Sequence, residues 1–126
     1  MIGSFCTIPH KEQRYDTAGD YIDLAGGKIR HYFISELGNE DYEFMVLIHE
    51  LIEHHLCLKR GIKEPDIMKF DVEYSGEFED NPGCDPAAPY HKEHMFSEMI
   101  ETLLAKELGV DSAEYDKSFE KLDYGR

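Results

Sequence analysis

Two long segments with helical periodicity constrain the fold of this chain more than any other feature. Apolar residues recur every three or four positions in residues 42–60 and again in residues 90–108. A glycine follows each segment, at positions 61 and 109, and glycine commonly ends a helix because it adopts the left-handed conformation easily. Asn39 supplies a capping side chain before the first segment. We therefore predict two long helices.

A β-hairpin is predicted ahead of the first long helix. Residues 21–24 and 29–34 are rich in β-branched and aromatic side chains. The Ala-Gly-Gly-Lys sequence between them is typical of a turn. Residues 1–18 are polar and follow no regular pattern, so we predict irregular structure there.

Two shorter helices complete the predicted elements. Residues 64–74 begin with a proline in the first turn and carry apolar side chains on one helical stripe. Asp111 and Glu114 form a capping box ahead of a last helix. Residues 75–90 are rich in glycine, proline and acidic residues, which is typical of a loop. Such a loop is expected to shape or cover a functional site.

Length and charge limit the class of protein. The 126 residues are one ordinary domain, and we expect residues 1–126 to form a single α+β domain with an N-terminal β-hairpin packed on about four helices. Twenty-seven acidic residues against thirteen basic ones give a net charge of −14, which repels phosphate and argues against a nucleic-acid partner. No apolar run approaches the roughly 20 residues that a membrane span needs.

The compartment follows from the N-terminus and the cysteines. The first residues lack the basic and apolar regions of a secretory signal. The three cysteines are scattered and odd in number, which favours a reducing compartment over a disulfide framework. We therefore expect a cytoplasmic protein. The cysteines are Cys6, Cys57 and Cys84.

His49 and Glu53 suggest a metal site on the first long helix. Residues four apart share a helical face, and Met45 and Val46 beside them indicate that this face is partly buried. A buried carboxylate and a buried imidazole both need partners, and one cation satisfies both. The alternative is a direct ion pair between the two side chains.

The second long helix offers further ligands on one stripe. His91, His94, Glu98 and Glu101 fall within ~80° of arc. Histidine with carboxylate is ordinary zinc or iron chemistry, whereas a solvated polar face is the alternative. Asp71 lies within an apolar stripe and needs a partner, either elsewhere in the fold or at the metal.

We predict one divalent metal bound by His49, Glu53 and His94. Zinc is the first expectation, with iron, nickel or manganese as alternatives. Additional ligands or supporting groups are expected among four further residues. They are Asp71, His91, Glu98 and Glu101.

The sequence His-Glu-Leu-Ile-Glu-His at 49–54 resembles the metal-binding helix of zincin metallopeptidases, whose pattern is His-Glu-x-x-His. The resemblance implies a minimal zincin-like fold with His49 as first ligand and Glu50 as the general base that takes a proton from water. Glu53 departs from the pattern, which has histidine there. His94 would then complete a set of two histidines and one carboxylate.

A broader resemblance covers most of the chain. Residues 19–21, the helix with His49 and Glu50, and residues 85–94 are similar to a group of small phage and prophage proteins. No established activity comes with that resemblance.

The expected function is a metal-dependent hydrolase, with a peptide or small molecule as substrate. His54 or His91 would stabilise a developing oxyanion. The alternative is a non-catalytic acidic module of phage origin that binds a protein partner, with a structural metal or none. A carboxylate-bridged dimetal bundle ranks third, because Glu-x-x-His spacings are missing.

Overall fold

The N-terminal part of the chain forms a three-stranded sheet. The computed structural model describes residues 1–125. Strands β1 (Ile2–Ile8), β2 (Gly19–Leu24) and β3 (Ile29–Ser35) lie in the order β1-β3-β2. β2 and β3 are antiparallel neighbours, so the predicted hairpin is confirmed, and the α+β fold class with it.

The prediction of irregular structure over residues 1–18 was wrong. Residues Ile2–Ile8 form β1, which pairs in parallel with β3, and a short 3-10 turn follows at His10–Glu12. β1 lies at the sheet edge, and all but the last of its residues are exposed. Its partner strand begins 27 residues later, Ile2 facing Ile29. An exposed strand with a distant partner shows no apolar alternation by which local sequence could reveal it.

Four helices follow, at the predicted places. They are α1 (Glu40–Lys59), α2 (Glu64–Glu73), α3 (His91–Leu108) and α4 (Ser112–Glu120). The side chain of Asn39 accepts a hydrogen bond from the Tyr42 N–H, and that of Asp111 accepts one from Glu114. Gly109 ends α3 in the left-handed conformation, with φ of 70°. Within the described chain no helix combines the length and the apolar character needed to cross a bilayer.

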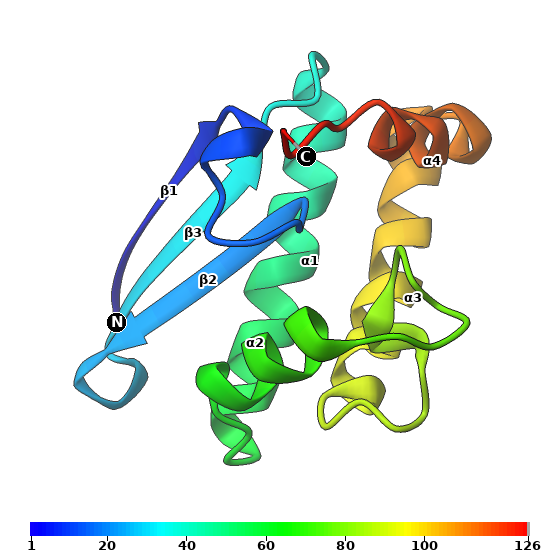
Figure 1. Cartoon of the computed structure of the whole chain (residues 1–126). Coiled ribbons are helices and arrows are strands. Elements are labelled where there is room, and N and C mark those ends of the chain that lie inside the picture. Colours follow the sequence, from blue (N-terminus) through cyan, green and yellow to red (C-terminus); the bar gives the residue numbers. More distant parts are fainter. Residues whose placement is uncertain (126) are drawn as a thin grey trace.

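α1 is the central element of the fold. It lies between the sheet and α3, with α2 and α4 near opposite ends of the α1–α3 pair (Figure 1). α1 therefore buries side chains on two sides.

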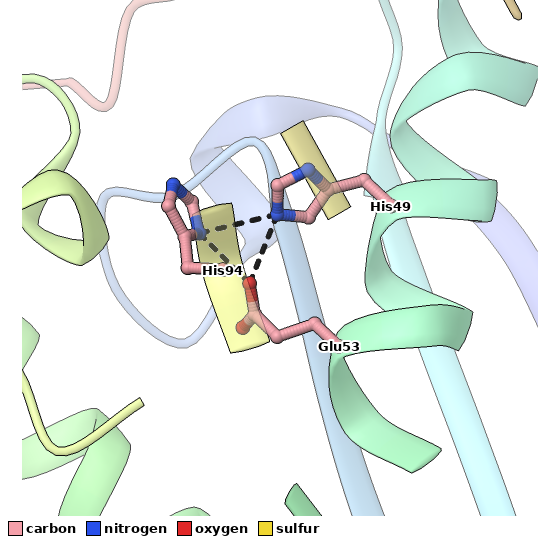
Figure 2. A group of neighbouring side chains, drawn as sticks. All are labelled: His49, Glu53 and His94. Atoms are coloured by element: carbon pink, nitrogen blue, oxygen red, sulfur yellow. Dashed lines mark hydrogen bonds and ion pairs between the residues drawn. The ribbon is translucent and has the colours of Figure 1, made fainter. Parts of the chain in front are cut away.

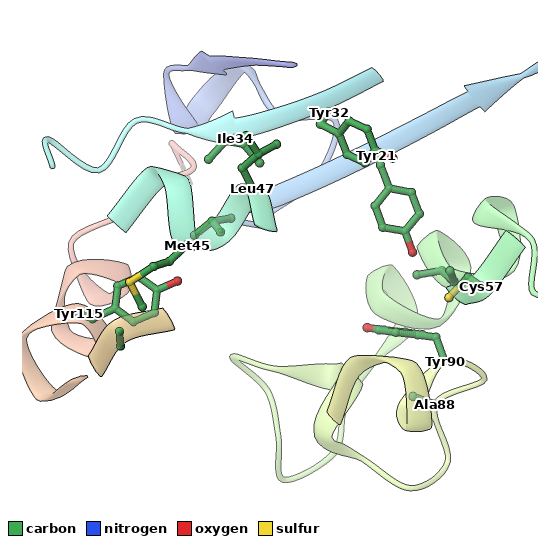
Figure 3. Packing of buried hydrophobic residues seen from close by; sticks show 12 residues of the cluster. Tyr21, Tyr32, Ile34, Met45, Leu47, Cys57, Ala88, Tyr90 and Tyr115 are labelled. Atoms are coloured by element: carbon green, nitrogen blue, oxygen red, sulfur yellow. The ribbon is translucent and has the colours of Figure 1, made fainter. Parts of the chain in front are cut away.

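The hydrophobic core extends along α1 in two parts (Figure 3). Met45 packs in the part near Ile34 and Tyr115, while Cys57 packs in the part near Tyr21 and Tyr90. Met45 and Cys57 lie twelve residues apart on one stripe of α1, and His49 and Glu53 occupy the two positions between them. Two polar side chains thus interrupt the core.

His54 packs against the sheet rather than at this polar interruption. The Tyr32 hydroxyl donates to His54 Nδ1 over 2.8 Å, and His54 Nε2 donates to Asp23 over 2.8 Å. The Tyr21 ring stacks on the imidazole with a centroid distance of 4.2 Å. The expected oxyanion role of His54 therefore does not fit its place in the fold.

We expect His54→Leu to lower the free energy of unfolding by about 3 kcal/mol, because the substitution leaves a buried hydroxyl and a carboxylate without their partner. Urea unfolding followed by circular dichroism measures this loss. His55→Ala is the control, since His55 is exposed and its loss is expected to cost under about 0.5 kcal/mol. Equal effects of the two substitutions would contradict a structural role for His54.

Candidate metal centre

Three donor atoms converge between α1 and α3 (Figure 2). His49 Nε2 lies 2.9 Å from Glu53 Oε2, and His94 Nδ1 lies 2.8 Å from the same oxygen. The two nitrogens are 3.2 Å apart. Ligand atoms around one transition-metal ion are separated by about 3.0 Å in octahedral and about 3.4 Å in tetrahedral geometry. The triangle formed by these three atoms, the donor triangle, therefore has the dimensions expected for three ligands of one metal ion.

The protons on His49 favour a cation at this triangle. His49 Nδ1 donates to Glu101 Oε1 over 2.6 Å, so a neutral His49 ring presents the lone pair of Nε2 to the Glu53 carboxylate. Without a cation, His49 would need a second proton to avoid repulsion between its lone pair and the Glu53 carboxylate. Its Nε2–H would then face the Nδ1–H that His94 donates to Glu53, over 3.2 Å. A divalent ion removes this repulsion and binds all three lone pairs.

Hydrogen bonds fix the carboxylates around the triangle. The Tyr115 hydroxyl donates to Glu101 Oε2 over 2.5 Å, and the Tyr21 hydroxyl donates to Glu53 Oε1 over 3.2 Å. Outer contacts of this kind orient the ligands of metal sites and fix the tautomer of a ligating histidine.

The triangle is almost fully enclosed. The exposed fractions of His49, Glu53 and His94 are 6%, 4% and 8%. Burial raises the pKa of Glu53, but hydrogen bonds from His49 and His94 outweigh it and bring the pKa to about 2. Burial lowers the pKa of His49, but its contacts with Glu101 and Glu53 prevail and hold that pKa well above its usual value. The ionised carboxylate that a metal requires is therefore stable in this environment.

The loop before α3 covers one side of the His94 ring. A 3-10 turn at Pro82–Cys84 places Gly83 so close that an added Cβ would lie 2.4 Å from His94 Cγ. His91 donates from Nδ1 to the Gly83 carbonyl over 2.9 Å. His91 therefore anchors the covering turn, and the structure does not bring it into the donor triangle.

Glu98 and Glu101 both lie beside the triangle, next to the outer nitrogens of its histidines. Glu98 Oε1 is 3.1 Å from His94 Nε2, while Glu101 contacts His49. Asn81 Nδ2 donates to Glu98 over 2.9 Å. The stripe on α3 thus supplies one candidate ligand and two supporting carboxylates.

We expect Glu101→Gln to weaken zinc binding by 10- to 100-fold, the range typical of outer-shell partners. The amide removes the charge that stabilises the His49 N–H while keeping the shape. Zinc affinity in competition with a chromophoric chelator measures the effect, and Glu107→Gln, on an exposed position of the same helix, is the control. Unchanged affinity in Glu101→Gln would argue against His49 as a ligand.

Asp71 does not contact the donor triangle directly but is linked to it through Tyr90. It accepts hydrogen bonds from Tyr90 over 2.5 Å and from Tyr15 over 3.1 Å, and the Tyr90 ring meets the His94 ring edge-on with a centroid distance of 5.7 Å. Asp71 therefore supports Tyr90 and through it His94. Burial raises the pKa of Asp71 to about 6, although both tyrosine hydrogen bonds lower it and the charge of His94 opposes that of Glu53.

The raised pKa of Asp71 predicts a pH dependence of stability. The folded state holds this proton up to about pH 6, whereas the unfolded chain releases it near pH 4. Asp71 therefore destabilises the fold as pH rises from 4 to 7, by on the order of 2 kcal/mol. In the presence of chelator, Asp71→Asn should gain stability relative to wild type over this range, as urea unfolding would show. A difference independent of pH would contradict the prediction.

Glu50 lies on the sheet side of α1, one residue from His49. Its side chain is half-buried against β2, where a Cβ on Gly19 would lie 2.7 Å from Glu50 Cγ. Burial raises the pKa of Glu50, and the neighbouring Glu53 charge raises it further. No hydrogen bond to its carboxylate is found in residues 1–125, so the group packs against Gly19 without a hydrogen-bonding partner there.

Two surface grooves lie away from the donor triangle. One, of about 440 Å³, borders Arg14 and the outer face of α2, and the other, of about 380 Å³, lies between Tyr74 and Ala87. Neither is lined by His49, Glu53 or His94.

No protein-family model, curated protein sequence or solved structure matches this chain, so its function has to be argued from the site. The supporting contacts of Tyr115 and Asn81 and the place of Cys84 beside His94 and Glu98 were not predicted from the sequence. Each comes from a segment other than the helix it supports. No local spacing signals such contacts.

Proposed function

We propose that this chain is a metal-dependent hydrolase with a mononuclear site between α1 and α3. The convergence of His49 Nε2, Glu53 Oε2 and His94 Nδ1 within 3.2 Å carries the proposal. Two histidines and a carboxylate are the protein ligands of several catalytic zinc sites, which keep a further position for water.

Zinc fits the donor set best, since imidazole and carboxylate are among its usual ligands. Iron, nickel or manganese would bind the same atoms. A zinc ion at this position would lower the pKa of a bound water to about 7.

Glu50 is the residue we assign to proton transfer. Its carboxylate is partly buried, lies close enough to Glu53 and His49 for their charges to shift its pKa, and accepts no hydrogen bond from residues 1–125. A general base needs such a free carboxylate within reach of the reacting water. Tyr21 and Glu101 hold the ligands in place, so they act on geometry rather than on protons of the substrate.

Turnover of a quenched fluorescent peptide library by the zinc-loaded protein tests the hydrolase. We expect wild type to cleave part of the library, and Glu50→Gln to keep its zinc while losing at least 100-fold in rate. Glu36→Gln, at an exposed position after β3, is the matched control and should retain full activity. Full activity of Glu50→Gln would exclude Glu50 as the base.

The enclosure of the triangle favours a second candidate function. A site with exposed fractions below 10% and both grooves elsewhere is also what a structural metal needs. The chain would then be an acidic protein-binding module with net charge −14. In that case zinc removal lowers the melting temperature, no peptide is cleaved, and Glu50→Gln changes neither property.

A further inference from the structure

We propose that Cys84, Glu98 and Nε2 of His94 form a second metal position beside the first, so that the His94 ring bridges two ions. The donor atoms of these three residues lie within 4.8 Å of one another. The inference rests on the proposed metal centre, because the two positions share His94.

The outer nitrogens of the two histidines differ in a way that points to a ligand. His49 Nδ1 donates an aligned hydrogen bond to Glu101. His94 Nε2 lies at ion-pair distance from Glu98 Oε1, 3.1 Å, but within residues 1–125 this buried nitrogen has no partner in hydrogen-bond geometry. A buried nitrogen without a hydrogen bond is costly. A separation of 3.1 Å is, however, ordinary for two ligands of one ion.

Cys84 completes the set from the covering turn. The contact of Gly83 with the His94 ring fixes the turn at Pro82–Cys84, and the free thiol of Cys84 is half-buried there. Asn81 holds Glu98 by its hydrogen bond. Thiolate, imidazole and carboxylate together are a zinc ligand set, and the thiolate distinguishes this position from the first.

A second cation can be bound without adding net charge to the centre. Glu53, Glu98 and Glu101 are three carboxylates around two imidazoles, with Glu50 close by. Binding of the second ion releases the thiol proton of Cys84 and the remaining ring proton of His94 to solvent, which leaves a thiolate and a bridging imidazolate as ligands. The two released protons offset the two charges of the ion, so the net charge of this buried group does not change.

Titration with Co²⁺ against a weak competing chelator tests the proposal. We expect wild type to bind two equivalents, and the near-ultraviolet charge-transfer absorption of a cobalt–thiolate bond to appear. Cys84→Ser should bind one equivalent without that absorption. Cys6→Ser is the matched control, since Cys6 is exposed on β1, and it should behave as wild type.

The alternatives give different results. One equivalent in wild type, without thiolate absorption and lost in Glu53→Gln, would overturn the second position and leave the first intact. One equivalent with thiolate absorption would make Cys84 a ligand of a single ion and would also overturn it, as would two equivalents in Cys84→Ser. No bound cobalt in wild type would remove both positions.

Discussion

Glu53→Gln is expected to remove most of the stabilisation of this protein by zinc. Zinc at 1,000 times its dissociation constant should stabilise the wild-type fold by about 4 kcal/mol, on the order of 15 °C in melting temperature for a domain of this size. Glutamine keeps the shape of Glu53 and its contact with Tyr21 but removes the charge that both histidines face. We expect the variant to gain less than about a quarter of that stabilisation.

Thermal unfolding with chelator and with zinc measures this difference. Glu40→Gln is the control, because Glu40 is exposed at the start of the same helix. It should respond to zinc as wild type does. An equal zinc response in Glu53→Gln would mean that zinc binds elsewhere on this acidic surface.

Gly83→Ala should damage the centre without changing any polar group. The added methyl would lie 2.4 Å from His94 Cγ and 2.7 Å from Nδ1, so the ring or the turn has to move. Overpacking of this kind typically costs about 1–3 kcal/mol. Because a displaced Nδ1 leaves the donor triangle, zinc affinity should fall at least tenfold.

Urea unfolding and zinc competition on the same variant separate the two effects of Gly83→Ala. Ala87→Ser, at an exposed position of the same loop, should change stability by under about 0.5 kcal/mol. Retained zinc affinity despite lost stability would show that the turn does not position His94.

The helices and the hairpin could be predicted because their signals are local. Asn39, Asp111 and Gly109 mark helix ends by their own chemistry, and the structure uses each of them as expected. β1 could not be predicted, because its exposed residues carry no pattern and its pairing with β3 is set by the tertiary fold. The zincin-like character of the fold stays a prediction.

In the candidate site, too, only the residues with a local sequence signal could be predicted. His49 and Glu53 face the same way because they are four residues apart, and His94 shares a stripe with Glu98 and Glu101. These residues could be selected from helical spacing, and the structure gathers them. Cys84 and Tyr115 join them from a loop and from α4, so contacts across the fold rather than spacing decide their roles.

The helical spacing of residues 90–108 did not predict the position of every residue correctly. It placed His91 on the ligand stripe, but His91 lies at the first position of α3, where it reaches the Gly83 carbonyl instead. Asp71 has two tyrosine partners, which agrees with the first of its two predicted alternatives, a partner elsewhere in the fold. A helical wheel gives the direction of a side chain, but not its depth along the neighbouring helix.

Whether His49, Glu53 and His94 hold a metal ion can be decided from the metal content of the purified protein. Untagged protein purified without chelator would be measured by elemental analysis, beside His49→Ala/Glu53→Ala. We expect at least one equivalent of a transition metal per chain in wild type and a loss of at least one equivalent in the double variant. A wild-type protein that carries none, and takes up none on dialysis against zinc, iron or manganese, would show that the triangle is a buried hydrogen-bond network and not a metal site.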